Sequence, residues 1–188
     1  MTDKNLIGKV QSVDTGNVTI KVEQEDVLNS VQVNQIVQIR STKTGETIIG
    51  LILKIVRRAV ADTVDADTDP GMIIENIIKV NLVGTLIAKQ GTQKNVFKRT
   101  LNTVPSINAD CALLQGDELS AFMHTLSTSG DNPLTIGKYT IADESIANLD
   151  GNKFFQRHAV IVGGPGSGKS WTVASILEKA SSLHAVNA

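Results

Sequence analysis

The sequence has few of the features that mark secreted or membrane proteins. Its 188 residues include one cysteine, Cys111, so no disulfide can form within the chain. A lone cysteine fits a reducing cytoplasm. No apolar run reaches the roughly 18 residues of a membrane span, and the N-terminus has no apolar stretch of signal-peptide length. We therefore expect a cytoplasmic protein with no membrane partner.

Aromatic residues and excess charge are also scarce. Phe, Trp and Tyr make up 3% of the chain, and its formal net charge is -1. The core must therefore consist mainly of Val, Ile and Leu, which favours strands. The charge balance lacks the basic excess usual in nucleic-acid-binding proteins. It does not exclude a ring-shaped assembly whose channel carries few charges per subunit.

The first part of the chain predicts a small β-barrel. Residues 6–58 contain short β-branched segments separated by turns, such as the alternating stretch 18–22. Gly50 interrupts an apolar run and is typical of a bulge or a barrel corner. Strand character returns over 77–104. Short strands at this spacing favour a barrel, and we place the end of this domain near residue 118.

Two further segments predict irregular structure. Residues 59–76 are acidic and contain no basic side chain, which predicts an exposed loop within the barrel domain. Its aspartate spacing approaches that of a calcium loop, but Pro70 stands where that loop needs glycine. Residues 117–123 predict a short helix that Asp117 could cap, and residues 127–157 contain turn signals such as Asn132-Pro133, so we predict that the bridge 119–157 is loop-rich over 127–157.

The segment 158–188 carries the clearest chemical motif. The apolar run 158–162 predicts a buried parallel strand, and residues 171–180 have apolar side chains at helical spacing, with Trp171 interpreted as a packing residue. Between them lies a full match to the P-loop pattern G-x-x-x-x-G-K-[ST]. Its members are Gly163, Gly164, Pro165, Gly166, Ser167, Gly168, Lys169 and Ser170.

Each residue type in this motif has a physical role. Glycines let the main chain approach phosphate oxygens, and successive N–H groups form a concave anion site at a helix N-terminus. Lys169 is the predicted catalytic residue because its charge would neutralise the β- and γ-phosphates. The Ser170 hydroxyl would be a ligand of Mg²⁺. The predicted cofactors are therefore ATP and Mg²⁺.

The residues after the motif do not complete a hydrolase. Only 18 residues follow Ser170, and they include no apolar run that ends in an acidic residue and no arginine. A P-loop ATPase needs a carboxylate for magnesium and water. We therefore expect the sequence to be part of a longer chain. A further hypothesis is a small-molecule kinase with an unusual barrel in front of it, although the sequences of such enzymes usually begin close to the P-loop.

Three stretches resemble the HerA family of hexameric DNA-translocating ATPases, within the HerA/FtsK group. They are Ile7-Gly8-Lys9-Val10, Phe97-Lys98-Arg99, and the segment 149–163 that enters the P-loop. The resemblance implies a HAS barrel, similar to the barrel of ATP synthase subunits, over 1–118. It implies that 158–188 are the first strand, P-loop and helix of a RecA-like α/β domain.

The resemblance also implies a function. Family members are homohexamers that use ATP to move double-stranded DNA, and their barrel helps to assemble the ring. Bacterial relatives occur in antiphage operons beside a nuclease or a sirtuin-like NADase that docks on the barrel. Site residues carry over only for 163–170. The alternative is an assembly and docking module in which ATP mainly stabilises the ring.

Overall fold

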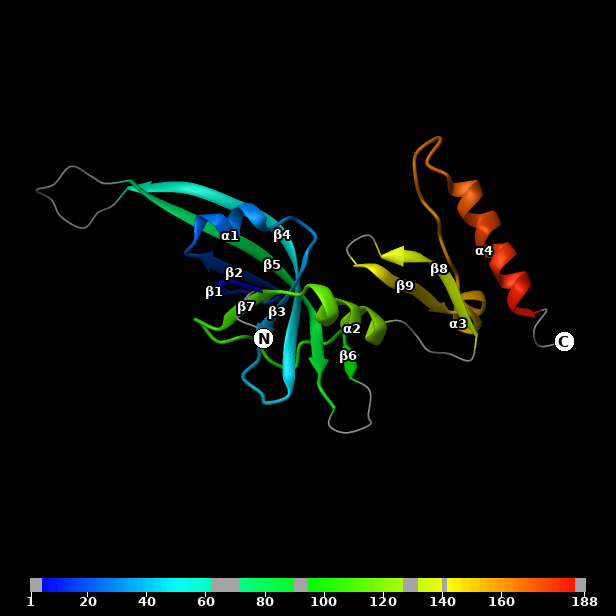
Figure 1. Ribbon diagram of the computed structural model, residues 1–188, viewed down its shortest axis with the longest axis horizontal. Coiled ribbons are helices and arrows are strands. Elements are labelled where there is room, and N and C mark those ends of the chain that lie inside the picture. The colour runs from blue at the N-terminus through cyan, green and yellow to red at the C-terminus, as the bar shows by residue number, and fades with distance from the viewer. Residues whose placement is uncertain (1–4, 62–71, 90–94, 127–131, 140–141, 185–188) are drawn as a thin grey trace, which may run out of the picture. The chain divides into compact units, whose positions relative to one another are not determined.

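The computed structural model describes residues 5–61, 72–89, 95–126, 132–139 and 142–184 (Figure 1). The chain divides into two compact units, 1–115 and 116–188. Among the described residues, no helix is long and apolar enough to cross a membrane.

The first unit contains a closed barrel of six antiparallel strands. They are β1 (Leu6–Val13), β2 (Asn17–Val22), β3 (Ile36–Arg40), β4 (Glu46–Ala61), β5 (Met72–Ile87) and β7 (Asp110–Leu113). The strands follow the order β2-β1-β7-β3-β4-β5, and pairing of β2 with β5 closes the ring. The predicted barrel is therefore confirmed.

The barrel interior follows from the alternation in the sequence. Val18, Ile20 and Val22 are buried on β2, and Ile78 and Val80 are buried on the neighbouring strand β5. The polar residues between them face outward because successive strand residues point to opposite faces. Closure leaves these six strands with few unpaired edges. The interior is thus filled by branched aliphatic side chains, as the low aromatic content predicts.

Gly50 and Cys111 show how tightly this interior is packed. The strand register shifts at Gly50, and a Cβ placed there would run into the Val80 side chain. The predicted bulge is therefore present, and it exists where two strands approach too closely for a side chain. Cys111 is fully buried, and burial raises the pKa of its thiol. It is a small core residue and not a reactive thiolate.

Strands β4 and β5 continue past the barrel as a two-stranded ribbon (Figure 1, cyan and green). Strand β3 pairs with β4 only as far as Leu51, and β2 pairs with β5 only from Asn76 onward. Residues 59–61 and 72–75 pair only with β5 and β4, respectively. The prediction of a loop over 59–76 is therefore wrong at both ends, because the residues there are paired strands of β4 and β5. The remaining residues, 62–71, lie outside the described residues.

Two smaller elements complete the first unit. Helix α1 (Glu25–Ser30) lies beside β2 and buries Leu28 in the barrel core. Strand β6 (Val96–Lys98) pairs with the end of β5. This strand lies within the region 77–104 that the sequence predicts to have strand character.

The second unit contains regular secondary structure within the segment that the sequence predicts to be a bridge. Its elements are α2 (Gly116–Leu126), β8 (Pro133–Tyr139), β9 (Ala142–Asp150), α3 (Gly151–Gln156) and α4 (Lys169–His184). Strands β8 and β9 form an antiparallel hairpin, and α2 lies beside β9. The short helix predicted at 117–123 is confirmed as part of α2. The loop-rich structure predicted over 127–157 is wrong where the hairpin forms, because the fully buried Leu134 pairs opposite Leu149 and gives the hairpin an apolar face.

Candidate nucleotide-binding site

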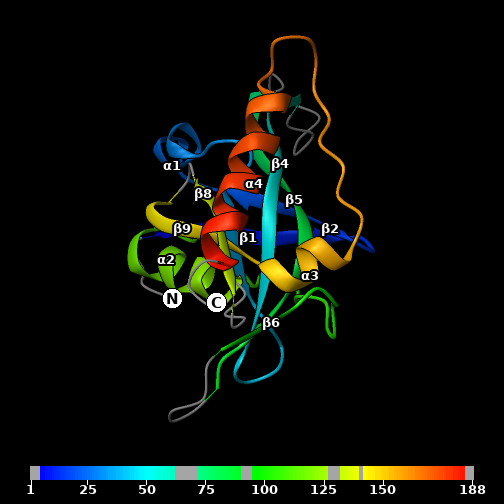
Figure 2. The same ribbon diagram turned by 90° about the vertical axis from the view of Figure 1, so that its right-hand side faces the viewer.

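The P-loop residues form one tight turn that leads into helix α4. Figure 2 shows the segment after α3 rising to this turn and α4 returning beside it. Gly166 and Gly168 have φ angles of 74° and 82°, a left-handed conformation that favours glycine. A Cβ on Gly163 would collide with the Ser167 side chain. The local geometry thus requires glycine at positions 163, 166 and 168 of the motif.

Lys169 is the first residue of α4 and folds back over the loop. Its Nζ donates hydrogen bonds to the carbonyl oxygens of Gly163 at 2.8 Å and Gly164 at 2.6 Å. Ser167 N–H donates to the Gly164 carbonyl at 3.3 Å, which tightens the same turn. The structure therefore places the ammonium group directly beside the loop backbone. Ser170 follows as the second helical residue and is exposed.

The electrostatics of this turn favour an anion. The first helical N–H groups of α4 have no partners within the helix, and the helix dipole adds partial positive charge at this end. The first turn of α4 contains no acidic residue. Lys169 adds a full positive charge at the same place. The eight predicted site residues form one continuous loop and helix start, whereas their ligand roles stay predictions.

The predicted strand at 158–162 is not formed. Residues 158–164 have no regular secondary structure, and Val162 is 84% exposed. A strand exists only when a neighbour accepts and donates its backbone hydrogen bonds, and no described strand pairs with this segment. Trp171 is 77% exposed, so its interpretation as a packing residue is also wrong for the described structure.

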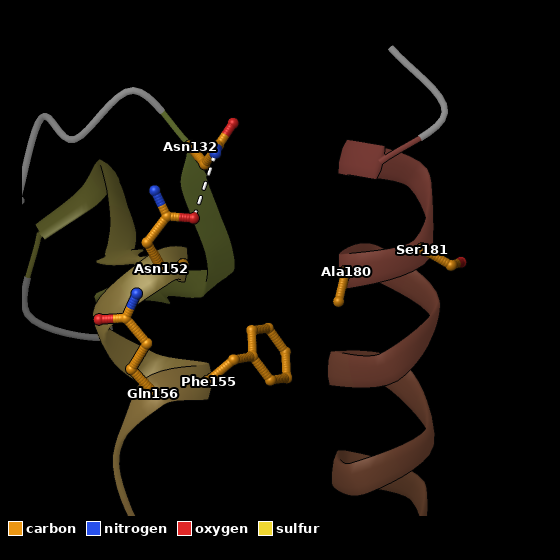
Figure 3. A pocket seen from close by; sticks show the side chains of 7 residues that line it. Asn132, Asn152, Phe155, Gln156, Ala180 and Ser181 are labelled. Carbon is orange, nitrogen blue, oxygen red and sulfur yellow. Dashed lines mark hydrogen bonds between the residues drawn. The ribbon is translucent and has the colours of Figure 1, made fainter. Parts of the chain in front are cut away.

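A cavity of about 660 Å³ lies at the opposite end of α4 (Figure 3). Phe155 of α3 points toward Ala180 of α4, and Asn132 donates a hydrogen bond to Asn152 at its rim, at 3.3 Å. Ala180 lies about 17 Å along the helix from Lys169, given a rise of about 1.5 Å per residue. The cavity is therefore too far from the P-loop to hold phosphates bound there.

The comparison with protein families bears on this unit. Residues 134–187 match the family model described as the central domain of helicase HerA. These residues are similar to that domain. The match contains the hairpin, α3, the P-loop and α4, and it confirms the resemblance for the segment 149–163, whereas the stretches 7–10 and 97–99 lie outside it. A search of curated proteins found no match to the chain.

The HerA match also bears on the organisation of the chain. It begins at Leu134, inside the segment that we predicted to be a bridge. The chain therefore has a closed antiparallel barrel followed by a short α/β region that contains a HerA-like domain segment. Sequence reasoning missed the β8–β9 hairpin of this segment. The alternation of Leu134 with Thr135 and of Ala147 with Asn148 was the signal that pointed to it.

Proposed function

We propose that the chain binds ATP with Mg²⁺ through residues 163–170, as the N-terminal portion of a ring-forming, HerA-like translocase of double-stranded DNA. The observation that best supports the proposed nucleotide-binding site is the position of Lys169. Its ammonium group lies over a turn of left-handed glycines at the start of α4. This arrangement supplies positive charge and N–H donors to one small volume, as polyphosphate binding requires.

Each proposed role follows from an atom at the turn. Lys169 would exchange its carbonyl contacts for the β- and γ-phosphate oxygens, and the Ser170 hydroxyl would be a ligand of Mg²⁺. Hydrolysis further needs a carboxylate that positions metal and water, together with an arginine near the transferred phosphoryl group. We assign neither role to a described residue. The ATP hydrolase activity is therefore proposed for the assembled ring.

The relationship to HerA supports the wider proposal about partners. It favours a homohexamer in the cytoplasm that works on double-stranded DNA with an effector enzyme docked on the barrel. A nuclease or a sirtuin-like NADase is the proposed effector, and antiphage defence is the proposed role.

One observation favours the docking-module alternative. The outer end of the β4–β5 ribbon exposes Val60, Ile73 and Ile74, and Ile74 is 60% exposed. Among the described residues, the strand edges of the ribbon are also unpaired there, and exposed apolar edges commonly mark contacts with other chains. DNA-stimulated ATP hydrolysis by the assembled ring separates the two functions. Translocation requires such stimulation, whereas docking requires only assembly and effector binding.

The nucleotide site is tested by replacing Lys169 in the full chain. We expect Lys169→Ala to abolish binding of Mg²⁺-ATP in isothermal titration calorimetry, because the loop then lacks its only full positive charge. Lys179→Ala removes the same charge from a later turn of α4 and should bind as the unmodified chain does. Equal affinity of the Lys169→Ala chain and the unmodified chain would refute the proposed site.

A further inference from the structure

One outer surface of the barrel collects lysines from adjacent strands. Lys9 on β1 pairs with Lys21 on β2, and Lys54 on β4 pairs with Lys79 on β5. All four side chains are exposed. The pairings β1–β2, β2–β5 and β5–β4 make these four strands neighbours. Paired residues point to the same side of a sheet, so the lysines share one surface.

The register shows how closely the charges lie. Lys79 pairs with Thr19 on one side and Lys54 on the other. In the adjacent row, Lys21 pairs with Ile77 and Lys9. Two like-charged pairs therefore occupy neighbouring rows of one surface. Like charges directly opposite each other disfavour strand pairing. The fold thus contains a repulsion that packing does not explain.

Protection of strand edges does not account for this pattern. Lysines are common on edge strands because they oppose aggregation. At these positions, however, Lys79 lies on a strand with neighbours on both sides, and so does Lys21. Neither lysine therefore lies on an edge strand. Among the described residues, moreover, none of the four lysines forms an ion pair with a carboxylate. Their charges are available to an external anion.

A groove runs through this surface. It has a volume of about 510 Å³, and the polar residues that line it are Gln11, Ser12, Thr19, Lys54, Arg58 and Lys79. Among the described residues, no carboxylate lines it. Arg58 is held at its border by Glu75, at 2.7 Å. Lysine, arginine, hydroxyl and amide groups are those that contact phosphate and sugar in protein–nucleic acid complexes.

We propose that this surface, the basic face (Lys9, Lys21, Lys54, Arg58 and Lys79), binds the phosphate backbone of double-stranded nucleic acid. The four strands are about 14 Å across. A duplex presents one negative charge per about 1.7 Å of axis, so several phosphates face a surface of this width. The binding does not depend on the proposed nucleotide site, which lies in the other unit of the chain.

The composition of the basic face selects this ligand over two others. Proteins that bind single strands commonly stack bases on aromatic side chains, and the basic face has none. Protein partners bury an apolar centre. The apolar residues of the groove are Val56 and Ile77, and neither is exposed. Contacts to phosphates alone carry no sequence information, so the binding should be independent of sequence.

The test uses the full chain, a fluorescently labelled 30-base-pair duplex and anisotropy titrations between 50 and 200 mM salt. With four lysine contacts, the logarithm of the association constant should fall with the logarithm of salt at a slope of about -3.6. Lys54→Gln/Lys79→Gln should reduce that slope by about 1.8 and weaken binding more than about tenfold at 50 mM salt. The melting temperature of this double variant should equal or exceed that of the unmodified chain, because the substitutions remove a repulsive pair of charges.

The matched control is Lys43→Gln/Lys98→Gln, which removes two exposed charges elsewhere on the same unit. This control should bind as the unmodified chain does. Equal weakening by both double variants would overturn the proposal in favour of net charge alone. Tighter binding of a polyglutamate peptide would overturn it in favour of an acidic protein partner. Absence of duplex binding at 50 mM salt would overturn it outright.

Discussion

The barrel and the P-loop segment 158–182 differ in the exposure of their apolar residues. In the barrel, Ile20, Ile39 and Ile78 have no exposed surface. In the P-loop segment, the equally apolar side chains of Val162, Trp171 and Leu177 are mostly exposed. A closed antiparallel sheet satisfies its own backbone and covers its own interior. A single helix with an unpaired extended segment does neither, so burial here depends on completing a sheet and not on hydrophobicity alone.

The largest effect should come from the barrel core. Ile78→Ala should lower the free energy of unfolding by about 2–5 kcal/mol, because it leaves a cavity among packed side chains. Leu177→Ala, on exposed α4, should change it by less than about 0.5 kcal/mol. Urea denaturation followed by far-UV circular dichroism measures both. Similar costs for the two variants would remove the contrast between the units.

A smaller effect should separate two glycines. Gly50→Ala places a Cβ against Val80 and should destabilise the barrel by about 1–3 kcal/mol. Gly164→Ala meets no atom within 4 Å and should leave stability almost unchanged. Thermal melting of both variants gives the comparison. A stable Gly50→Ala chain would show that the strands at the bulge can move apart.

The smallest effect concerns Asp150, which caps α3. Its carboxylate accepts a hydrogen bond from the Lys153 N–H at 3.1 Å and pairs with the Lys153 ammonium at 2.9 Å. The ammonium and the N–H together lower the pKa of Asp150 from its ordinary value of 3.8. A lowered pKa means that the stabilisation is present above that ordinary value and is lost as the pH falls through the folded-state pKa.

Amide hydrogen exchange at Lys153 measures this local contribution. Protection should be greater in the unmodified chain than in Asp150→Ala at neutral pH, and the two should converge as the carboxyl becomes protonated in acid. The barrel amides should show no such difference. A pH-independent difference would mean that the cap acts through shape and not through charge.

Local patterns accounted for much of the molecule. The alternation on β2 predicted a barrel strand, and the glycines and Lys169 predicted the turn before α4. The closing β2–β5 pairing joins residues about sixty positions apart, and no local pattern specifies it. The ends of the β4–β5 ribbon were not predicted, because the acidic composition of residues 59–76 indicated a loop. The pairing of Val60 with Ile73 is not visible in that composition. The strand at 158–162 was predicted from composition, but composition cannot supply a hydrogen-bonding neighbour.

The burial of Cys111 makes the chain a favourable background for site-specific probes. Its thiol is fully enclosed and resists ionisation, so maleimide reagents should not label the folded protein at this position. A cysteine introduced at an exposed position such as Ser170 or Lys79 would then be the one reactive thiol of the chain. A fluorophore or spin label placed there would report separately on the P-loop or on the basic face.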